Sequence, residues 1–203
     1  MSLFARSWSD LLAAVDNLDD ADFAEPSGCA RWLIRDLVCH LVIDAQDVLI
    51  TLATPAAGEP TRDAASYWNL LDAEPAGDDP LDALTVRLAG AYGDPGLQKF
   101  HLDDVGAAAV RAAQVADPDA LIATRGEILT VRDYLGAYVL EATLHHLDLR
   151  TAAPPWPEGL ARSRAMLETI AGKPFPASWS DTDALLIGTG RRRLPGFRPI
   201  YLG

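Results

Sequence analysis

The sequence TVRDYLGAYVLEATLHHLDLR, residues 130–150, carries the strongest indication of the fold. Apolar residues recur in it at helical spacing, with one polar stripe between them. Thr130 and Asp133 have the spacing of an N-cap and an N3 carboxylate, which together satisfy free amide groups at a helix start. Prolines between residues 154 and 157 end the pattern, because proline cannot continue a helix. We therefore expect a long, core-facing helix from Thr130 to about Arg150.

Helical spacing of apolar residues recurs along the rest of the chain. We expect further helices over residues 3–17, 33–53, 81–116 and 158–171, the third of them broken by glycine and proline near residues 93–96. With so little strand signal, the natural architecture is all-α: a four-helix bundle with additional short helices and a small irregular C-terminal appendage.

The segments between these helices carry weaker signals. Residues 54–80 are rich in proline and glycine and predict a long connection that contains one short helix, Arg62–Asp72. A connection of this length is often functional, for example as a lid over a site. Residues 121–129 are expected to form a short extended piece or a loop. Residues 184–187, ALLI, are the one convincing strand candidate.

The composition limits the kinds of partner. A chain of 203 residues that is 49% hydrophobic suits one domain of ordinary size with a small appendage. A formal net charge of −12 disfavours nucleic acids and anionic membranes, because both require a basic surface. Arg191, Arg192, Arg193 and Arg198 occur with no acid after Asp183, and we expect them in a solvated tail rather than an anion-binding patch.

Two cysteines, Cys29 and Cys39, are too few for a disulfide framework. The first ten residues lack the apolar core and the cleavage pattern of a signal peptide, and no apolar window is long enough to span a bilayer. We therefore expect a cytoplasmic protein with reduced thiols. Neither cysteine is expected to be a nucleophile, because Cys39 suits a small core position and no base is positioned beside Cys29.

Two histidines and a carboxylate form a plausible metal site. Glu141 and His145 are four residues apart, so they lie one turn apart on one helix face. His40 lies between Asp36 and Asp44 in a polar stripe on the second predicted helix. Burying such groups without partners is costly, and a divalent metal is one suitable partner. Two histidines and one carboxylate leave coordination positions open, as catalytic zinc and non-haem iron sites do.

A plainer interpretation of the same pattern stays open. A glutamate four residues before a histidine is a common surface pair, and a stripe of acids is usually the solvated face of a helix. Asp36 is either a helix-start carboxylate or a hydrogen-bond acceptor for His40. We expect His146 to point away from this face, as a supporting or surface residue, and His101 to be exposed.

Two motifs resemble those of the mycothiol-dependent maleylpyruvate isomerase family, which belongs to the DinB-like superfamily of four-helix metal-binding proteins. CARWLIRDLVCHL, residues 29–41, resembles the first motif, with Trp32 eight residues before a ligand histidine. Residues 130–149 resemble the second motif, in which a glutamate and a histidine four residues later complete the metal site. Residues 189–191, TGR, are similar to a short element near the end of family members. The resemblance covers most of the chain in order and spacing.

The resemblance implies a DinB-like bundle with the metal ligands His40, Glu141 and His145. It favours zinc over nickel or iron, and it implies mycothiol as the cosubstrate, together with a small electrophilic substrate. We expect the metal-binding bundle over residues 1–155 and a C-terminal helix with an irregular tail, packed on the bundle, over residues 156–203. A monomer and a homodimer are both compatible with the sequence.

The expected activity is mycothiol transfer to a small electrophile, or its thiol-assisted isomerisation. Leu33 stands where the family usually has a threonine-like helix cap, and the chain ends soon after residues 189–191, whereas the isomerase has a fuller C-terminal domain. Transfer is therefore at least as well supported as isomerisation. Two alternatives are a metal-activated hydrolase, with Asp44 as the base, and a metal-binding helical protein without enzymatic activity.

Overall fold

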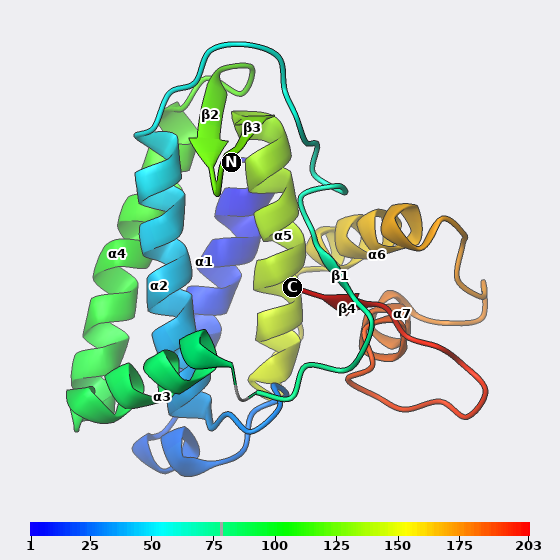
Figure 1. Ribbon diagram of the computed structural model, residues 1–203. Helices are drawn as coiled ribbons and strands as arrows, with labels where there is room; N and C mark the ends of the chain where they lie inside the picture. Colours follow the sequence, from blue (N-terminus) through cyan, green and yellow to red (C-terminus); the bar gives the residue numbers. More distant parts are fainter. Residues whose placement is uncertain (78) are drawn as a thin grey trace.

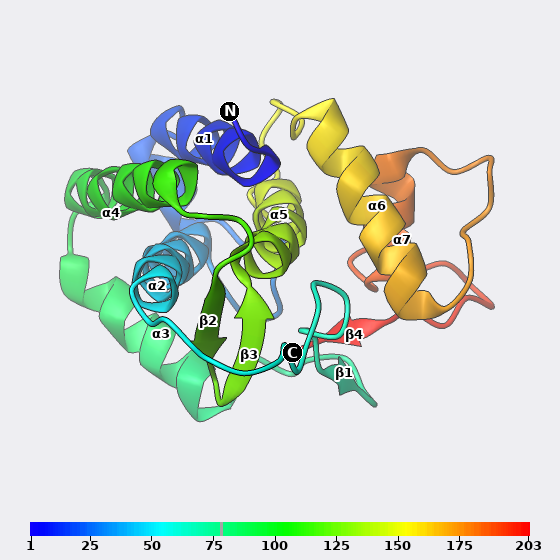
Figure 2. The ribbon, with the colours of Figure 1, turned by 90° about the horizontal axis from the view of Figure 1, so that it is seen from above.

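Four long helices form a bundle in the computed structural model, which describes residues 1–77 and 79–203 (Figure 1). They are α1 (Leu3–Asp16), α2 (Ile34–Leu52), α4 (Pro95–Val115) and α5 (Val131–Asp148). Helix α1 packs against α4 and α5, and α2 packs against α4 and also contacts α5. Seen from above, the four helices surround a common core (Figure 2). The predicted all-α bundle is confirmed.

The core of the bundle consists of large apolar side chains from all four helices. Trp8 of α1, Leu37 and Leu41 of α2, Leu102 of α4 and Tyr134 of α5 are all almost completely buried. Burying a leucine side chain of this kind stabilises the fold by roughly 1.5–3 kcal/mol relative to leaving it exposed. These contacts fix the facing sides of α2 and α5, which carry the predicted metal ligands.

The predicted break near residues 93–96 separates α3 (Pro80–Tyr92) from α4. Gly93 has φ 66°, a left-handed conformation that glycine adopts without strain, and it ends α3. Asp94 then begins α4, because its side chain accepts a hydrogen bond from the Gly96 amide, and Pro95 occupies the first helical position. A short 3₁₀ helix, η1 (Asp20–Ala24), links α1 to the loop before α2.

Residues 121–129, expected as an extended piece or a loop, contribute to a β-hairpin. Strand β2 (Leu121–Thr124) pairs antiparallel with β3 (Glu127–Thr130), and Leu121 lies opposite Thr130. The turn residues Arg125 and Gly126 both have positive φ, as the tight turns of two-residue hairpins require. Thr130 ends β3 and caps α5, since its hydroxyl accepts a hydrogen bond from the Asp133 amide.

The C-terminal part packs against the outer side of α5. It contains α6 (Pro157–Ala171), α7 (Asp181–Gly188) and β4 (Tyr201–Leu202). A second apolar cluster joins α5 to these helices, with Leu140 and Leu144 of α5 contacting Leu167 and Leu185. The predicted boundary between residues 155 and 156 falls in the loop between α5 and α6, and the division into two parts stays a prediction.

Two of the predicted elements are wrong. Residues 184–187, predicted as a strand, lie in α7, where Ser180 and Asp183 form a capping box that starts a helix. Residues 62–72, predicted as a helix, form a turn followed by β1 (Leu70–Leu71), which pairs with β4. Asp63 stabilises the turn, because its carboxylate accepts hydrogen bonds from the amides of residues 65 and 66. Residue 78, part of the predicted connection 54–80, lies outside the described residues.

The connection before residue 78 runs beside the β2–β3 hairpin and then along α5 (Figure 1). Pro55 forms a bridge with Ile122, and the Thr61 amide donates to the Ile128 carbonyl. Across the described residues, none of the helices combines the length and the apolar character that a membrane crossing requires.

Candidate metal centre

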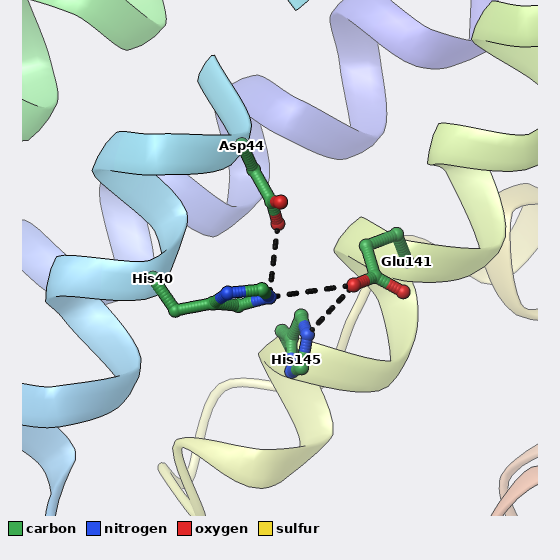
Figure 3. A group of neighbouring side chains, drawn as sticks. All are labelled: His40, Asp44, Glu141 and His145. Carbon is green, nitrogen blue, oxygen red and sulfur yellow. Dashed lines mark hydrogen bonds and ion pairs between the residues drawn. The ribbon is translucent and has the colours of Figure 1, made fainter. Parts of the chain in front are cut away.

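Four side chains meet between α2 and α5 (Figure 3). His40 and Asp44 come from α2, and Glu141 and His145 come from α5. The Glu141 Oε1 atom lies 3.0 Å from His145 Nε2 and 3.4 Å from His40 Nε2, and Asp44 Oδ2 lies 3.3 Å from His40 Nε2. The structure thus brings the three predicted ligands together and adds Asp44 to them.

The cluster is buried on one side and accessible on the other. His145 and Asp44 are almost fully buried, whereas the side chains of His40 and Glu141 retain 24% and 19% of their exposure. His40 and Glu141 are therefore the partly exposed members of the cluster, and His145 and Asp44 are its enclosed members.

The charges in the cluster are strongly coupled. Burial opposes ionisation of Glu141, but the neighbouring imidazoles of His145 and His40 hold the pKa of its carboxyl well below the ordinary value. Burial likewise opposes the charged form of His145, yet the Glu141 carboxylate raises the pKa of that imidazole well above its ordinary value. Without a metal, the pair is therefore an ionised carboxylate beside a protonated histidine.

The imidazoles of His40 and His145 compensate the charge of Asp44 only in part. Burial raises the pKa of its carboxyl to about 6. Its Oδ2 atom is close to His40, but the geometry is not that of a hydrogen bond, so among the described residues this buried oxygen has no hydrogen-bond partner. A buried oxygen of this kind favours an additional positive partner.

A divalent metal fits these donors. Metal–ligand bonds of about 2.0–2.1 Å at tetrahedral angles place neighbouring ligand atoms about 3.3 Å apart. Three of the separations between donor atoms are close to this spacing: 3.0 Å for Glu141–His145, 3.3 Å for Asp44–His40 and 3.4 Å for Glu141–His40. One donor atom from each side chain lies within 4.8 Å of all the others. Imidazole and carboxylate are also the ligand types that zinc, nickel and iron accept.

A second group of side chains lies on the other nitrogen of His145. Asp148 Oδ2 is 3.1 Å from His145 Nδ1, and the Cys29 sulfur is 3.7 Å from the same nitrogen. Arg191 forms two hydrogen bonds of 2.8 Å with the Asp148 carboxylate. Two expectations are wrong here: Cys29 does lie beside a base, and Arg191 is part of a buried ion pair and not of a solvated tail.

The sequence could indicate only one of these three residues. Asp148 lies three positions after His145, on the same helix face, so its spacing is a usable signal. Cys29 and Arg191 reach the site from a loop and from the C-terminal segment. Both belong to motifs that resemble the family, at residues 29–41 and 189–191, but neither motif predicts a contact with His145 or Asp148. Burial raises the pKa of the Cys29 thiol, so the cysteine stays protonated and is a poor nucleophile.

Aromatic side chains surround the cluster. The ring centroid of Trp32 lies 5.2 Å from that of His40. Tyr67, from the connection after α2, packs 6.0 Å from Tyr134 and 6.3 Å from Tyr138, one turn before Glu141 on α5. Burial raises the pKa of all three tyrosines, so they remain neutral phenols. Part of the segment predicted as a lid therefore lies close to the cluster.

The remaining predicted polar residues lie outside the cluster. Asp36 Oδ2 accepts a hydrogen bond of 2.9 Å from the Leu33 amide, which is the helix-start role. His146 is buried and its Nε2 atom lies 3.1 Å from the Ala153 carbonyl oxygen, so it is not a surface residue. His101, expected to be exposed, is half-buried and 2.7 Å from the Tyr92 hydroxyl. Cys39 is a buried core residue, and burial raises the pKa of its thiol to about 11.

Comparisons with known proteins identify the family and the fold of the chain. A family model described as "Mycothiol maleylpyruvate isomerase N-terminal domain" matches residues 4–150. Among solved structures, a mycothiol-dependent maleylpyruvate isomerase is similar, with a TM-score of 0.58, 17% identity, and coverage of 81% of this chain and 68% of that chain. A point mutant of a mycothiol-dependent maleylpyruvate isomerase gives a TM-score of 0.57 and 17% identity, with 82% and 68% covered. At this identity the two structures establish the fold alone. No curated protein matches the sequence.

Proposed function

Because the chain belongs to the mycothiol maleylpyruvate isomerase N-terminal domain family, we propose that it is a metal-dependent enzyme that uses mycothiol to act on small electrophiles. The reaction is transfer of the thiol to the electrophile, or an isomerisation that passes through such an adduct. The observation that carries the proposal is the cluster of His40, Glu141 and His145. Their donor atoms lie within 4.8 Å of one another, and Glu141 Oε1 is 3.4 Å and 3.0 Å from the two histidine nitrogens.

The proposed ligand atoms are Nε2 of His40, Oε1 of Glu141 and Nε2 of His145. These ligands suit zinc best, and nickel or iron are also compatible with them. A divalent ion with one carboxylate and two neutral imidazoles keeps a net positive charge, and three protein ligands leave a position for a small molecule. A metal bound there would lower the pKa of a thiol at that position and make a thiolate available near neutral pH.

The protein supplies the proton acceptor and the enclosed surroundings. Asp44 lies 3.3 Å from His40 and is the neighbouring carboxylate that accepts the proton of the incoming thiol. The thiolate then forms a carbon–sulfur bond with an activated double bond, and the protonated Asp44 returns the proton to the carbon left with the electron pair. In an isomerisation, Asp44 keeps the proton while the electron pair is delocalised onto the conjugated carbonyl group. After rotation about the bond that has become single, the electron pair re-forms the double bond, the carbon–sulfur bond breaks, and the released thiolate takes the proton back from Asp44. Trp32 and Tyr67 limit the access of water to these steps.

The position of Asp44 beside the proposed metal site also supports a second candidate function, metal-activated hydrolysis. A buried carboxylate with a raised pKa beside a metal site is a suitable general base for a water molecule. In that reaction Asp44 would accept a proton from water instead of from a thiol, and mycothiol would not be consumed.

Mass spectrometry separates the two reactions. The zinc-supplemented protein is incubated with mycothiol and a slowly reacting α,β-unsaturated carbonyl compound. We expect a thiol adduct that forms faster than without enzyme, a loss of this acceleration in His145→Ala, and no loss in the control His101→Ala, which changes a histidine outside the cluster. Absence of an adduct with every electrophile tested, together with hydrolysis of an ester or amide, would favour the hydrolase.

The non-enzymatic alternative has its own test. If the purified protein holds no metal, and His145→Ala changes neither the free energy of unfolding nor any ligand binding, the cluster has no metal-dependent function. The proposed function predicts the opposite result for both measurements.

A further inference from the structure

Asp148 connects three parts of the chain that are far apart in sequence. It lies at the end of α5, is only 1% exposed, and contacts both the loop before α2 and the segment after α7. The backbone is also tightly packed at this point. The Gly28 amide donates a 2.8 Å hydrogen bond to the Asp148 carbonyl, and a Cβ atom on Gly28 would lie 2.2 Å from Asp148 Oδ1.

The Asp148 carboxylate is surrounded by donors. Arg191 donates from Nε to Oδ1 and from Nη2 to Oδ2, both at 2.8 Å, and the Cys29 thiol donates to Oδ2 at 3.3 Å. His145 Nδ1 lies 3.1 Å from Oδ2. An ionised carboxylate can only accept hydrogen bonds, so this contact requires the proton of His145 to be on Nδ1. The two-pronged contact with Arg191 keeps the carboxylate ionised and fixes its plane.

The position of this proton determines what the other ring nitrogen can do. With Nδ1 protonated, the lone pair of a neutral His145 is on Nε2, the nitrogen that faces Glu141 and His40. Histidines that bind metals commonly donate their second N–H group to a carboxylate, which fixes the ring and makes it a better ligand.

We propose that Asp148, held by Arg191, is a positioning residue that keeps the Nδ1 proton of His145 and directs Nε2 of that ring toward the metal centre. This role rests on the proposed function, since it requires His145 to bind a metal. It gives the C-terminal segment a part in the site, although Arg191 lies outside residues 4–150, which the family model matches. Gly190 has φ 81°, and Tyr201 and Pro199 would contact a side chain there, so the segment that carries Arg191 is closely fitted.

Zinc affinity and the state of His145 test the proposal together. We compare the wild type with Asp148→Asn, Arg191→Gln and Arg191→Lys by competition with a zinc-binding fluorescent chelator. The matched control is Arg192→Gln, which removes a neighbouring arginine that pairs with Asp183 and not with Asp148. Long-range ¹H–¹⁵N spectra of the zinc-loaded proteins show which nitrogen of His145 carries a proton.

We expect Asp148→Asn to bind zinc about 10- to 100-fold more weakly than the wild type, which is the loss typical when a carboxylate that supports a ligand histidine is changed. Arg191→Gln should show a smaller loss, Arg191→Lys should restore part of it, and Arg192→Gln should behave as the wild type. The Nδ1 proton of His145 should be protected from exchange in the wild type and unprotected in Asp148→Asn.

Asp148→Asn leaves Arg191 buried without its partner and could prevent folding. The double variant Asp148→Asn/Arg191→Gln removes both charges, and it should show the same loss of zinc affinity with normal helical circular dichroism. Wild-type affinity in the folded variants would overturn the positioning role and leave the proposed metal site intact. Failure of the wild type itself to bind zinc would overturn both proposals.

Discussion

Asp44 is the carboxylate of the cluster whose charge the protein compensates least. Burial raises the pKa of its carboxyl from 3.8 to about 6. Because the folded protein then binds more protons than the unfolded chain, the contribution of this group to stability falls as the pH rises between these two values.

We therefore expect Asp44→Asn to stabilise the metal-free protein near neutral pH, by about 3 kcal/mol, and to lose this effect below about pH 4. Urea unfolding of the metal-free proteins at the two pH values measures the difference. The control Asp47→Asn changes a half-exposed carboxylate on the same helix and should have little effect. A metal-free Asp44→Asn protein less stable than the wild type near neutral pH would show that the Asp44 charge is compensated.

Cys29 provides a prediction about the nucleophile. Burial raises the pKa of its thiol, so we expect slow alkylation by iodoacetamide in the native protein and rapid alkylation in urea, as measured by intact mass. The same is expected of Cys39, with its pKa of about 11. A mycothiol-dependent reaction should leave Cys29 unmodified. A substrate adduct on Cys29 during turnover would mean that the protein's own thiol is the nucleophile.

Individual site residues differed in how well the sequence indicated them. The spacing of Glu141 and His145 places them on one helix face, and the polar stripe around His40 marks a second such face. Whether the two faces meet depends on helix packing across 101 positions, which no local pattern encodes. The family resemblance supplied that pairing. Arg191 was misjudged because its partner, Asp148, lies 43 positions earlier.

Helix packing depends on a close approach of α1 and α4 at Gly106. A Cβ atom there would lie 2.8 Å from Leu12 Cδ2 and 2.9 Å from Trp8 Nε1, and Trp8 is fully buried. Gly106→Ala should therefore destabilise the protein, by about 1–3 kcal/mol, despite the better helix propensity of alanine. Gly90 of α3 is the matched control, because nothing lies within 4 Å of its added Cβ. Gly90→Ala should stabilise the protein by up to about 1 kcal/mol.

Guanidinium chloride unfolding of the two variants checks this pair. The free energy of unfolding should fall in Gly106→Ala and rise in Gly90→Ala. Equal stabilisation by both substitutions would show that α1 and α4 can separate at Gly106 without cost.

The elements that the sequence predicted well are those with strong ends as well as periodic apolar residues. Helix α5 has the Thr130 cap and a proline-rich segment after it, and its predicted limits agree with the structure. The run at residues 184–187 is too short for its periodicity to separate a buried strand from a buried helical turn. Residues 62–72 have a weak helical pattern but do not form a helix. The turn at Asp63 and the pairing of β1 with β4 stabilise a different backbone conformation there.

In the molecule as a whole, α5 is shared between two apolar clusters. Tyr134 and Tyr138 contribute to the cluster of the bundle, while Leu140 and Leu144 contribute to the cluster with α6 and α7. Glu141 and His145 are therefore carried by a helix that is packed on several sides, which suits side chains that must hold a fixed geometry. The net charge of −12 favours solubility and takes no direct part in this arrangement.

The metal content of the purified protein tests the proposed metal site most directly. Wild type, His40→Ala and the control His101→Ala are purified identically, dialysed against a weak chelator and analysed by inductively coupled plasma mass spectrometry. We predict stoichiometric zinc, or nickel or iron in its place, in the wild type and in His101→Ala, and loss of the metal in His40→Ala. A wild type that holds no divalent metal and takes up none on addition, or a His40→Ala variant that retains as much metal as the wild type, would contradict the proposed site.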